Sequence, residues 1–254
     1  NARVQLADGV KGGTKDFVLR YELRGKDVGT GMLVFPGDGK SEKYFLATVQ
    51  PPASLDDVAM PAREYVFIVD VSGSMRGYPL NAARKLMDEL IGGMQSNDRF
   101  NVMTFSGGQA VLADKSLPVT PENVANARAV MAGMRGGGGT RILPALKRAL
   151  AMPAAEGTSR TFVVITDGFV SVESEVFELI NKNLGEANLF AFGIGNSLNR
   201  HLIEGMARAG MGEPFMVMGA KDAEAEASKF QRYIASPALT DIKVRFDGFN
   251  AYDV

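Results

Sequence analysis

Residues 65–75 read Y-V-F-I-V-D-V-S-G-S-M, a stretch that joins an apolar strand to a polar loop. Val66 to Val69 form an unbroken apolar run, which is typical of strands buried on both faces in a parallel sheet covered by helices. The run ends at Asp70, and Ser72 and Ser74 follow at alternate positions. The stretch therefore predicts an α/β fold in which a central strand leads into a loop rich in oxygen atoms.

This loop lies where α/β proteins bind ligands, because ligands of open parallel sheets bind at the carboxyl ends of the strands. Gly73 lets the backbone turn tightly between the two serines. The loop therefore predicts a cluster of hard oxygen donors at a functional position. The simpler interpretation is a serine-rich turn that caps the next helix, and these residues alone leave both open.

The composition excludes several classes of function. The 254 residues suffice for one large domain or for a standard domain with a smaller companion. A net charge of −1 argues against nucleic-acid binding, and the absence of cysteine excludes disulfides, thiolate metal sites and a cysteine nucleophile. No apolar run approaches the length of a membrane span, and the first residues do not resemble a signal peptide. Because the chain begins without methionine, we expect it to be a piece of a longer protein.

Both ends of the chain carry a β pattern, in which apolar and polar residues alternate with a period of two. Because an isolated strand pair is marginally stable in water, we expect the two ends to pair in one module. The strand candidates are residues 17–24, 32–35, 43–50 and 242–247. The predicted domains are a small all-β module formed by residues 1–60 (with a linker) and 236–254, and an inserted α/β unit at 61–235.

Within the α/β unit, strand patterns alternate with helix patterns. Thr120 and Pro121 mark a helix start, with a hydroxyl N-cap and proline at the first position. The helix that follows is expected to bury Val124, Ala127, Val130, Met131 and Met134. Gly107-Gly108 is a candidate two-residue hairpin turn. The predicted strands are 66–69, 100–105, 109–113, 162–165, 189–194 and 215–218, and the predicted helices are 80–94, 121–134, 142–150, 175–184, 199–209 and 223–234.

Two later loops repeat the arrangement of the first. Thr140 follows four glycines at the head of a helix, and Asp167 ends a second apolar strand. If the sheet is mostly parallel, all three loops open on the same edge. Three hydroxyls and two carboxylates, without thiolate or imidazole, suit a hard cation such as Mg²⁺, Mn²⁺ or Ca²⁺. The predicted metal site consists of Asp70, Ser72, Ser74, Thr140 and Asp167.

These loops resemble the metal-ion-dependent adhesion site of von Willebrand factor A domains. In that family, a D-x-S-x-S loop is followed by a threonine in a second loop and an aspartate in a third. Here the three motifs stand as D-V-S-G-S, G-G-G-G-T and T-D-G. The resemblance covers residues 63–235 and implies a doubly wound, Rossmann-like sheet of six strands, mostly parallel with one antiparallel edge strand.

The flanking segments look like those around the A domain of inter-α-trypsin inhibitor heavy chains and their bacterial relatives. They read K-D-F-V-L-R-Y before the α/β unit and L-T-D-I-K-V-R-F-D-G-F after it. Strand alternation alone produces part of the second match. This resemblance implies a bacterial parent protein that is secreted or attached to the cell surface and has an upstream domain that this chain lacks.

The resemblance also implies how the site binds. Ser72, Ser74 and Thr140 are expected to touch the metal directly, and Asp70 and Asp167 to act through water. A cation ringed by neutral hydroxyls keeps most of its charge and favours a carboxylate from a partner protein or another acidic ligand. Residues at the rim would set partner choice or be ordinary solvated side chains. The rim candidates are Arg76, Tyr78, Arg135, Arg141 and Phe169.

Other interpretations compete with this binding module. A Mg²⁺-dependent hydrolase or phosphotransfer enzyme also has an aspartate at a strand end, but it usually carries a second acid or base two residues on, where Ser72 stands. A structural scaffold with a vestigial metal site fits the same motif. A phosphate-binding loop at Gly136–Gly139 would need a following lysine, and Thr140-Arg141 follows instead. His201 is expected at the surface. We therefore expect no enzymatic activity.

Overall fold

The computed structural model describes residues 29–35, 43–50, 62–168, 170–219, 221–235, 244–248 and 251. The chain divides into two compact units, Asn1–Asp56 and Asp57–Val254.

The described part of the first unit is an antiparallel pair of strands, β1 (Gly29–Phe35) and β2 (Tyr44–Gln50), in which Leu33 faces Leu46. The predicted strands at 32–35 and 43–50 are confirmed. Both faces of the pair are apolar and exposed: Leu33 is 71% exposed on one face and Met32 is 60% exposed on the other. A strand pair with two uncovered apolar faces needs further packing partners to be stable.

The prediction that residues 1–60 and 236–254 form one module stays a prediction. Residues 17–24, the linker at 51–61 and Ile242 lie outside the described residues. Val244 to Asp247, where the alternation predicts a strand, have no regular secondary structure.

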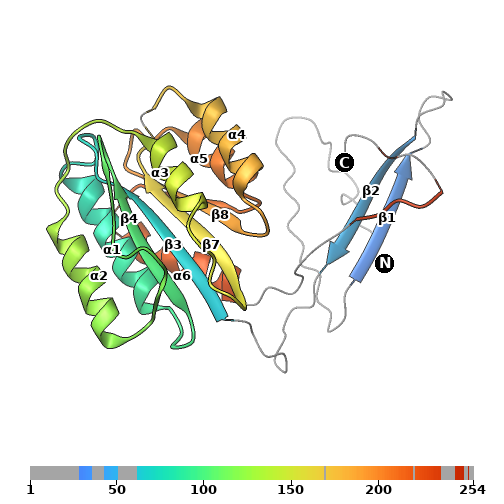
Figure 1. Cartoon of the computed structure of the whole chain (residues 1–254). Coiled ribbons are helices and arrows are strands. Elements are labelled where there is room, and N and C mark those ends of the chain that lie inside the picture. The colour runs from blue at the N-terminus through green and yellow to red at the C-terminus, as the bar shows by residue number, and fades with distance from the viewer. Residues whose placement is uncertain are drawn as a thin grey trace, which may run out of the picture. The chain divides into compact units, whose positions relative to one another are not determined.

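The second unit is built on one mixed, mostly parallel sheet with the strand order β5-β4-β3-β7-β8-β9 (Figure 1). β3, β4, β7, β8 and β9 are parallel, while β5 and a short extra strand, β6, run antiparallel to β4. The doubly wound fold is therefore confirmed, with β6 as an addition. The strands are β3 (Ala62–Asp70), β4 (Arg99–Phe105), β5 (Gln109–Val111), β6 (Leu117–Pro118), β7 (Thr158–Thr166), β8 (Asn188–Ile194) and β9 (Pro214–Val217).

Six helices among the described residues cover the two faces of this sheet (Figure 1). Alternate side chains of β3 enter the two cores: Phe67 packs with α1, α2 and α6, and Ile68 packs with α3, α4 and α5. This explains the unbroken apolar run, because a strand covered on both faces has no polar side. The helices are α1 (Tyr78–Gly92), α2 (Pro121–Gly133), α3 (Ile142–Leu150), α4 (Glu173–Asn183), α5 (Arg200–Ala209) and α6 (Asp222–Ala235).

Two local predictions about this unit are wrong. The hairpin after β4 has a three-residue loop at 106–108, because Phe105 pairs with Gln109 and Ser106 N donates to the Gly108 carbonyl at 2.8 Å. Val130 is 41% exposed, so it does not belong to the buried face of α2. The predicted start of α2 is confirmed, since the Thr120 hydroxyl accepts a hydrogen bond from Asn123 N at 3.2 Å.

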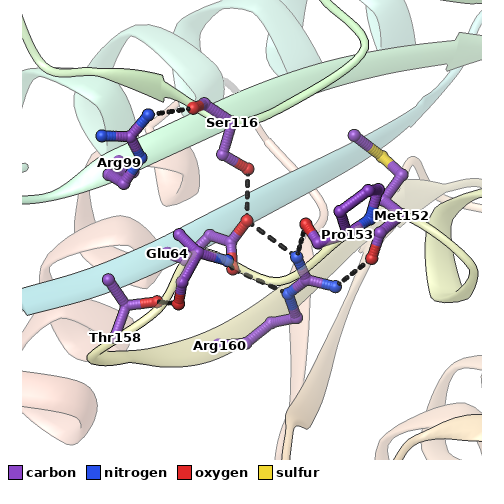
Figure 2. A network of polar contacts seen from close by, with 8 residues as sticks. Glu64, Arg99, Ser116, Met152, Pro153, Thr158 and Arg160 are labelled. Carbon is purple, nitrogen blue, oxygen red and sulfur yellow. Dashed lines mark hydrogen bonds and ion pairs between the residues drawn. The ribbon is translucent and has the colours of Figure 1, made fainter.

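A buried ion pair, which the sequence analysis did not identify, joins the amino-terminal part of β3 to β7 (Figure 2). The fully buried Glu64 carboxylate accepts both Nε and Nη2 of Arg160 at 2.8 Å. It also accepts the Ser116 hydroxyl at 2.5 Å and Ala155 N at 3.0 Å. Burial by itself would raise the pKa of Glu64, but the bonds from Arg160, Ser116 and Ala155 outweigh it and lower the pKa. The charged carboxylate is thus fully satisfied inside the protein.

We predict that Glu64→Gln destabilises this unit by about 3–5 kcal/mol, since it leaves the Arg160 charge buried without a counter-charge. The matched control is Asp88→Asn, which breaks an exposed pair with Arg128 and should cost less than about 1 kcal/mol. Urea unfolding at neutral pH measures both values. Equal losses in the two variants would contradict this account.

The same pair predicts a pH dependence. Because the pKa of Glu64 is lower in the folded state, the stabilisation is present above the ordinary glutamate pKa of about 4.3 and is lost as the pH falls through the lowered value. The wild type should therefore lose more stability than Glu64→Gln between about pH 5 and pH 2. Parallel acid-unfolding curves for the two proteins would refute the prediction.

Candidate functional site

The loop that follows β3, called the serine loop (residues 71–77), is organised by the carboxylate of Asp70. This side chain is fully buried, and its Oδ1 accepts a hydrogen bond from Ser72 N at 2.8 Å. Its Oδ2 accepts the Thr166 hydroxyl from the end of β7 at 2.6 Å. The Thr166 hydroxyl in turn accepts Gly168 N at 3.0 Å. Asp70 thus links the serine loop to the neighbouring central strand.

The two serine hydroxyls lie side by side, with 3.1 Å between Ser72 Oγ and Ser74 Oγ. Ser72 is buried and Ser74 is exposed, so the pair leads from the interior to the surface. α1 begins after Gly77, a residue without a side chain, so its N-cap makes no side-chain hydrogen bond. The serines therefore do not cap this helix, and the simpler interpretation of the loop is wrong.

The glycine loop (residues 136–139) packs directly on the serine loop. Gly73 N donates to the Gly138 carbonyl at 3.0 Å, and Gly137 N donates to the Val71 carbonyl at 2.9 Å. Thr140 follows the glycine loop and is half-buried. These backbone bonds bring the turn that carries Thr140 against the loop that carries the two serines.

Asp167 lies directly after β7 and is almost completely buried. Its carbonyl accepts Asn199 N at 3.0 Å, which joins the third loop to the start of α5. Burial is the main cause that raises the pKa of Asp70, and the negative charge of Asp167 raises it further, although hydrogen bonds from Thr166 and Ser72 oppose the shift. The structure therefore holds two buried carboxylates close enough to repel each other, an arrangement that a bound cation would relieve.

The donor set consists mostly of hydroxyls. In the part of the chain that the structure describes, no group of three or more His, Cys, Asp or Glu side chains is placed to hold a metal ion. This is compatible with the predicted site, which has two carboxylates and three hydroxyls. Oxygen donors of this kind fit Mg²⁺, Mn²⁺ or Ca²⁺ better than softer metals.

Four of the five predicted rim residues lie in the described chain, and Phe169 lies outside it. Arg76, Arg135 and Arg141 are exposed, and Arg76 Nε donates to the Gly136 carbonyl at 3.3 Å. Tyr78 is 40% exposed. Its pKa is raised by partial burial and by the negative charge of Asp222. His201 is exposed, as predicted.

The sequence analysis assigned no role to Thr166, which positions Asp70, or to Asn199, whose side chain bonds to Glu173 Oε1 at 3.0 Å and to Leu202 N at 3.1 Å. Thr166 stands directly before Asp167. The sequence feature that could have indicated its role is a hydroxyl side chain at the end of an apolar strand that neighbours β3.

The model of the von Willebrand factor type A domain family matches residues 63–214. The chain belongs to this family. A von Willebrand factor A domain-containing protein of Dictyostelium discoideum is 28% identical over 187 residues, covering 70% of this chain and 20% of that protein. Human inter-alpha-trypsin inhibitor heavy chain H3 is 25% identical over 244 residues, covering 91% of this chain and 26% of that protein. The chain thus spans about a quarter of the length of these relatives.

Solved structures share the fold of this von Willebrand factor type A domain. A type A protein from Catenulispora acidiphila has a TM-score of 0.62 at 18% identity, covering 83% of this chain and 50% of that one. The pilus adhesin SpaC from Lactobacillus rhamnosus GG, in its open conformation, has a TM-score of 0.58 at 14% identity, covering 70% of this chain and 30% of that one. The PilB minor pilin from Streptococcus sanguinis has a TM-score of 0.57 at 11% identity, covering 82% of this chain and 77% of that one.

We predict that the contact between the two loops depends on Gly136. A Cβ atom at this position would lie 2.7 Å from Arg76 Cα and 2.9 Å from Arg76 N, whereas a Cβ at Gly137 would meet nothing within 4 Å. Gly136→Ala should therefore cost about 1–3 kcal/mol of stability, and Gly137→Ala should stay within about 0.5 kcal/mol of the wild type. Urea unfolding compares the two variants, and an equal cost for both would show that the loops do not pack in this way.

Proposed function

We propose that this domain is a divalent-cation-dependent binding module that recognises an acidic group of a partner through the site formed by the three loops. In the proposal, Ser72, Ser74 and Thr140 hold the cation directly, and Asp70 and Asp167 act through water. The observation that carries the proposal is the pair of backbone hydrogen bonds between the serine loop and the glycine loop, at 3.0 and 2.9 Å. These bonds join the serine loop to the segment that directly precedes Thr140, which supports a site shared by the two segments.

The chemistry of these donors favours an acidic ligand. A bound cation would supply a positive charge at the surface, and hydroxyl ligands leave most of that charge unneutralised. At 4 Å, two unit charges attract by about 4 kcal/mol at an effective dielectric constant of 20, before the cost of desolvation is subtracted. The exposed Ser74 gives a ligand access from solvent, while the buried Asp70 stays behind it.

The family supports a role in binding. Domains of the von Willebrand factor type A family bind proteins and are typically not enzymes. The structural neighbours include a pilus adhesin and a minor pilin. We therefore propose an adhesive role and place the parent protein outside the cell or at its surface. Among the described residues, none of the helices is both long and apolar enough to cross a bilayer.

The first test measures cation binding by stability. Mg²⁺ at one hundred times its dissociation constant should raise the free energy of unfolding by about 2.7 kcal/mol if the unfolded chain does not bind it. Asp70→Ala and Thr140→Ala should each abolish this increase, because each removes a member of the site. Thermal or urea unfolding with and without Mg²⁺ gives the value.

The control is Asp88→Ala, which removes an exposed carboxylate from α1 far along the helix from the serine loop. It should keep the full Mg²⁺ effect. If Asp70→Ala and Thr140→Ala respond to Mg²⁺ as strongly as the control, the proposed site is not where the cation binds. Turnover of phosphate esters that is lost in Asp70→Ala would favour the enzymatic alternative.

A further inference from the structure

The surface around the candidate site carries three arginines from two neighbouring loops. Arg76 belongs to the serine loop, and Arg135 and Arg141 flank the segment that contains the glycine loop and Thr140. All three are exposed. The hydrogen bonds between the serine loop and the glycine loop join the two segments that carry Arg76, Arg135 and Arg141.

Two of the arginines are partly held by backbone carbonyls. Arg76 Nε donates to the Gly136 carbonyl at 3.3 Å, and Arg135 Nη1 donates to the Ala132 and Met134 carbonyls at 3.1 Å. Both guanidinium groups keep further N–H donors for a ligand. The backbone N–H of Arg141 donates to the Ser106 carbonyl at 2.9 Å.

Among the described residues, these three arginines differ from others of the domain in their ion pairing. Within the described ranges, no carboxylate forms an ion pair with any of the three, whereas Arg128, Arg160 and Arg200 pair with Asp88, Glu64 and Glu204. An arginine presents a planar fork of donors that binds a carboxylate through two parallel hydrogen bonds. The three arginines are therefore suited to bind acidic groups of a ligand.

Acidic side chains lie beside the third loop and beside Tyr78. Glu173 Oε1 accepts Asn199 Nδ2 at 3.0 Å, and the backbone N–H of Asn199 bonds to the Asp167 carbonyl. Asp222 lies close enough to Tyr78 for its charge to raise the pKa of that side chain, after the effect of burial. Negative charge on a ligand would be repelled near Glu173 and Asp222 and attracted near the three arginines.

We propose that the site selects acidic protein segments, in which the carboxylate that binds the cation is accompanied by further Asp or Glu side chains lying over Arg76, Arg135 and Arg141. This inference rests on the proposed cation-dependent function and adds the class of ligand to it. An isolated carboxylate uses the metal alone, whereas an acidic segment also uses the arginines. The site thereby discriminates between ligands that share the same metal-binding group.

The test compares two labelled synthetic peptides with the Mg²⁺-loaded full chain by fluorescence anisotropy. One peptide has a single Glu in a Gly/Ser background, and the other has three additional Glu residues beside it. Exposed ion pairs contribute about two- to threefold in affinity each, so three of them should make the acidic peptide bind about eightfold to thirtyfold more tightly than the single-Glu peptide. This advantage should shrink as the salt concentration rises, because exposed charges are screened.

The decisive variant is the double change Arg135→Gln/Arg141→Gln, which leaves the Arg76 packing on Gly136 untouched. It should remove most of the advantage of the acidic peptide, while the affinity of the single-Glu peptide and the Mg²⁺-induced stabilisation stay unchanged. The matched control is Arg208→Gln, at the exposed end of α5 and about 13 Å along the helix from its start beside Asp167. It should preserve the advantage in full.

The failures of the two proposals can be told apart. Equal, Mg²⁺-dependent binding of the two peptides by the wild type would overturn the inference on the acidic segment and leave the cation-dependent function intact. Absence of any Mg²⁺-induced stabilisation would overturn the proposed function itself. A sulfated oligosaccharide of equal charge that binds more tightly than the acidic peptide would also overturn the inference, because the site would then prefer a glycan.

Discussion

The candidate site depends on the hydrogen bonds of one buried carboxylate. Asp70 is removed from water at the end of the central strand β3, where an uncompensated charge is costly. Ser72 N and the Thr166 hydroxyl compensate part of this cost and fix the direction of the serine loop. The residual cost is visible in the raised pKa of Asp70, which burial and the neighbouring Asp167 produce. The cation that we propose would offset this cost.

The buried carboxylates at the two ends of β3 differ in how their charges are compensated. At the amino-terminal end of β3, the Glu64 carboxylate pairs with Arg160 and accepts hydrogen bonds from two further donors, so its charge is compensated (Figure 2). At the carboxyl-terminal end, Asp70 lies beside a second carboxylate, and the arginines around it form no ion pair with a carboxylate of the described chain. The charge of β3 is thus compensated at its amino-terminal end, while its carboxyl-terminal end is where we propose that a cation binds.

The elements of the α/β unit were predictable because their patterns are local, and the errors arise where contacts between distant segments decide. The Gly107-Gly108 pattern is the same for two- and three-residue loops, and the register between Phe105 and Gln109 selects the longer one. Val130 has helical spacing with its apolar neighbours, but only Ala127 and Met131 of α2 are buried. The sequence around Glu64 indicates only a polar residue at the start of a strand. Its role could not be predicted, because the residues that donate hydrogen bonds to it lie 52 to 96 positions away. The residues of the candidate metal site were predicted from three short motifs, whereas the role of Thr166 became recognisable only when β7 was placed beside β3.

The central claim is that hydroxyls from the serine loop and from the turn after the glycine loop meet at one divalent cation. The most direct measurement is a crystal structure of the full chain soaked in Mn²⁺, with the metal located by its anomalous scattering. The account predicts one peak about 2.1 Å from each of Ser72 Oγ, Ser74 Oγ and Thr140 Oγ1, with a solvent or carboxylate oxygen completing an octahedron. A peak elsewhere, or a Thr140 hydroxyl that lies beyond a single coordination shell from the two serines, would contradict it.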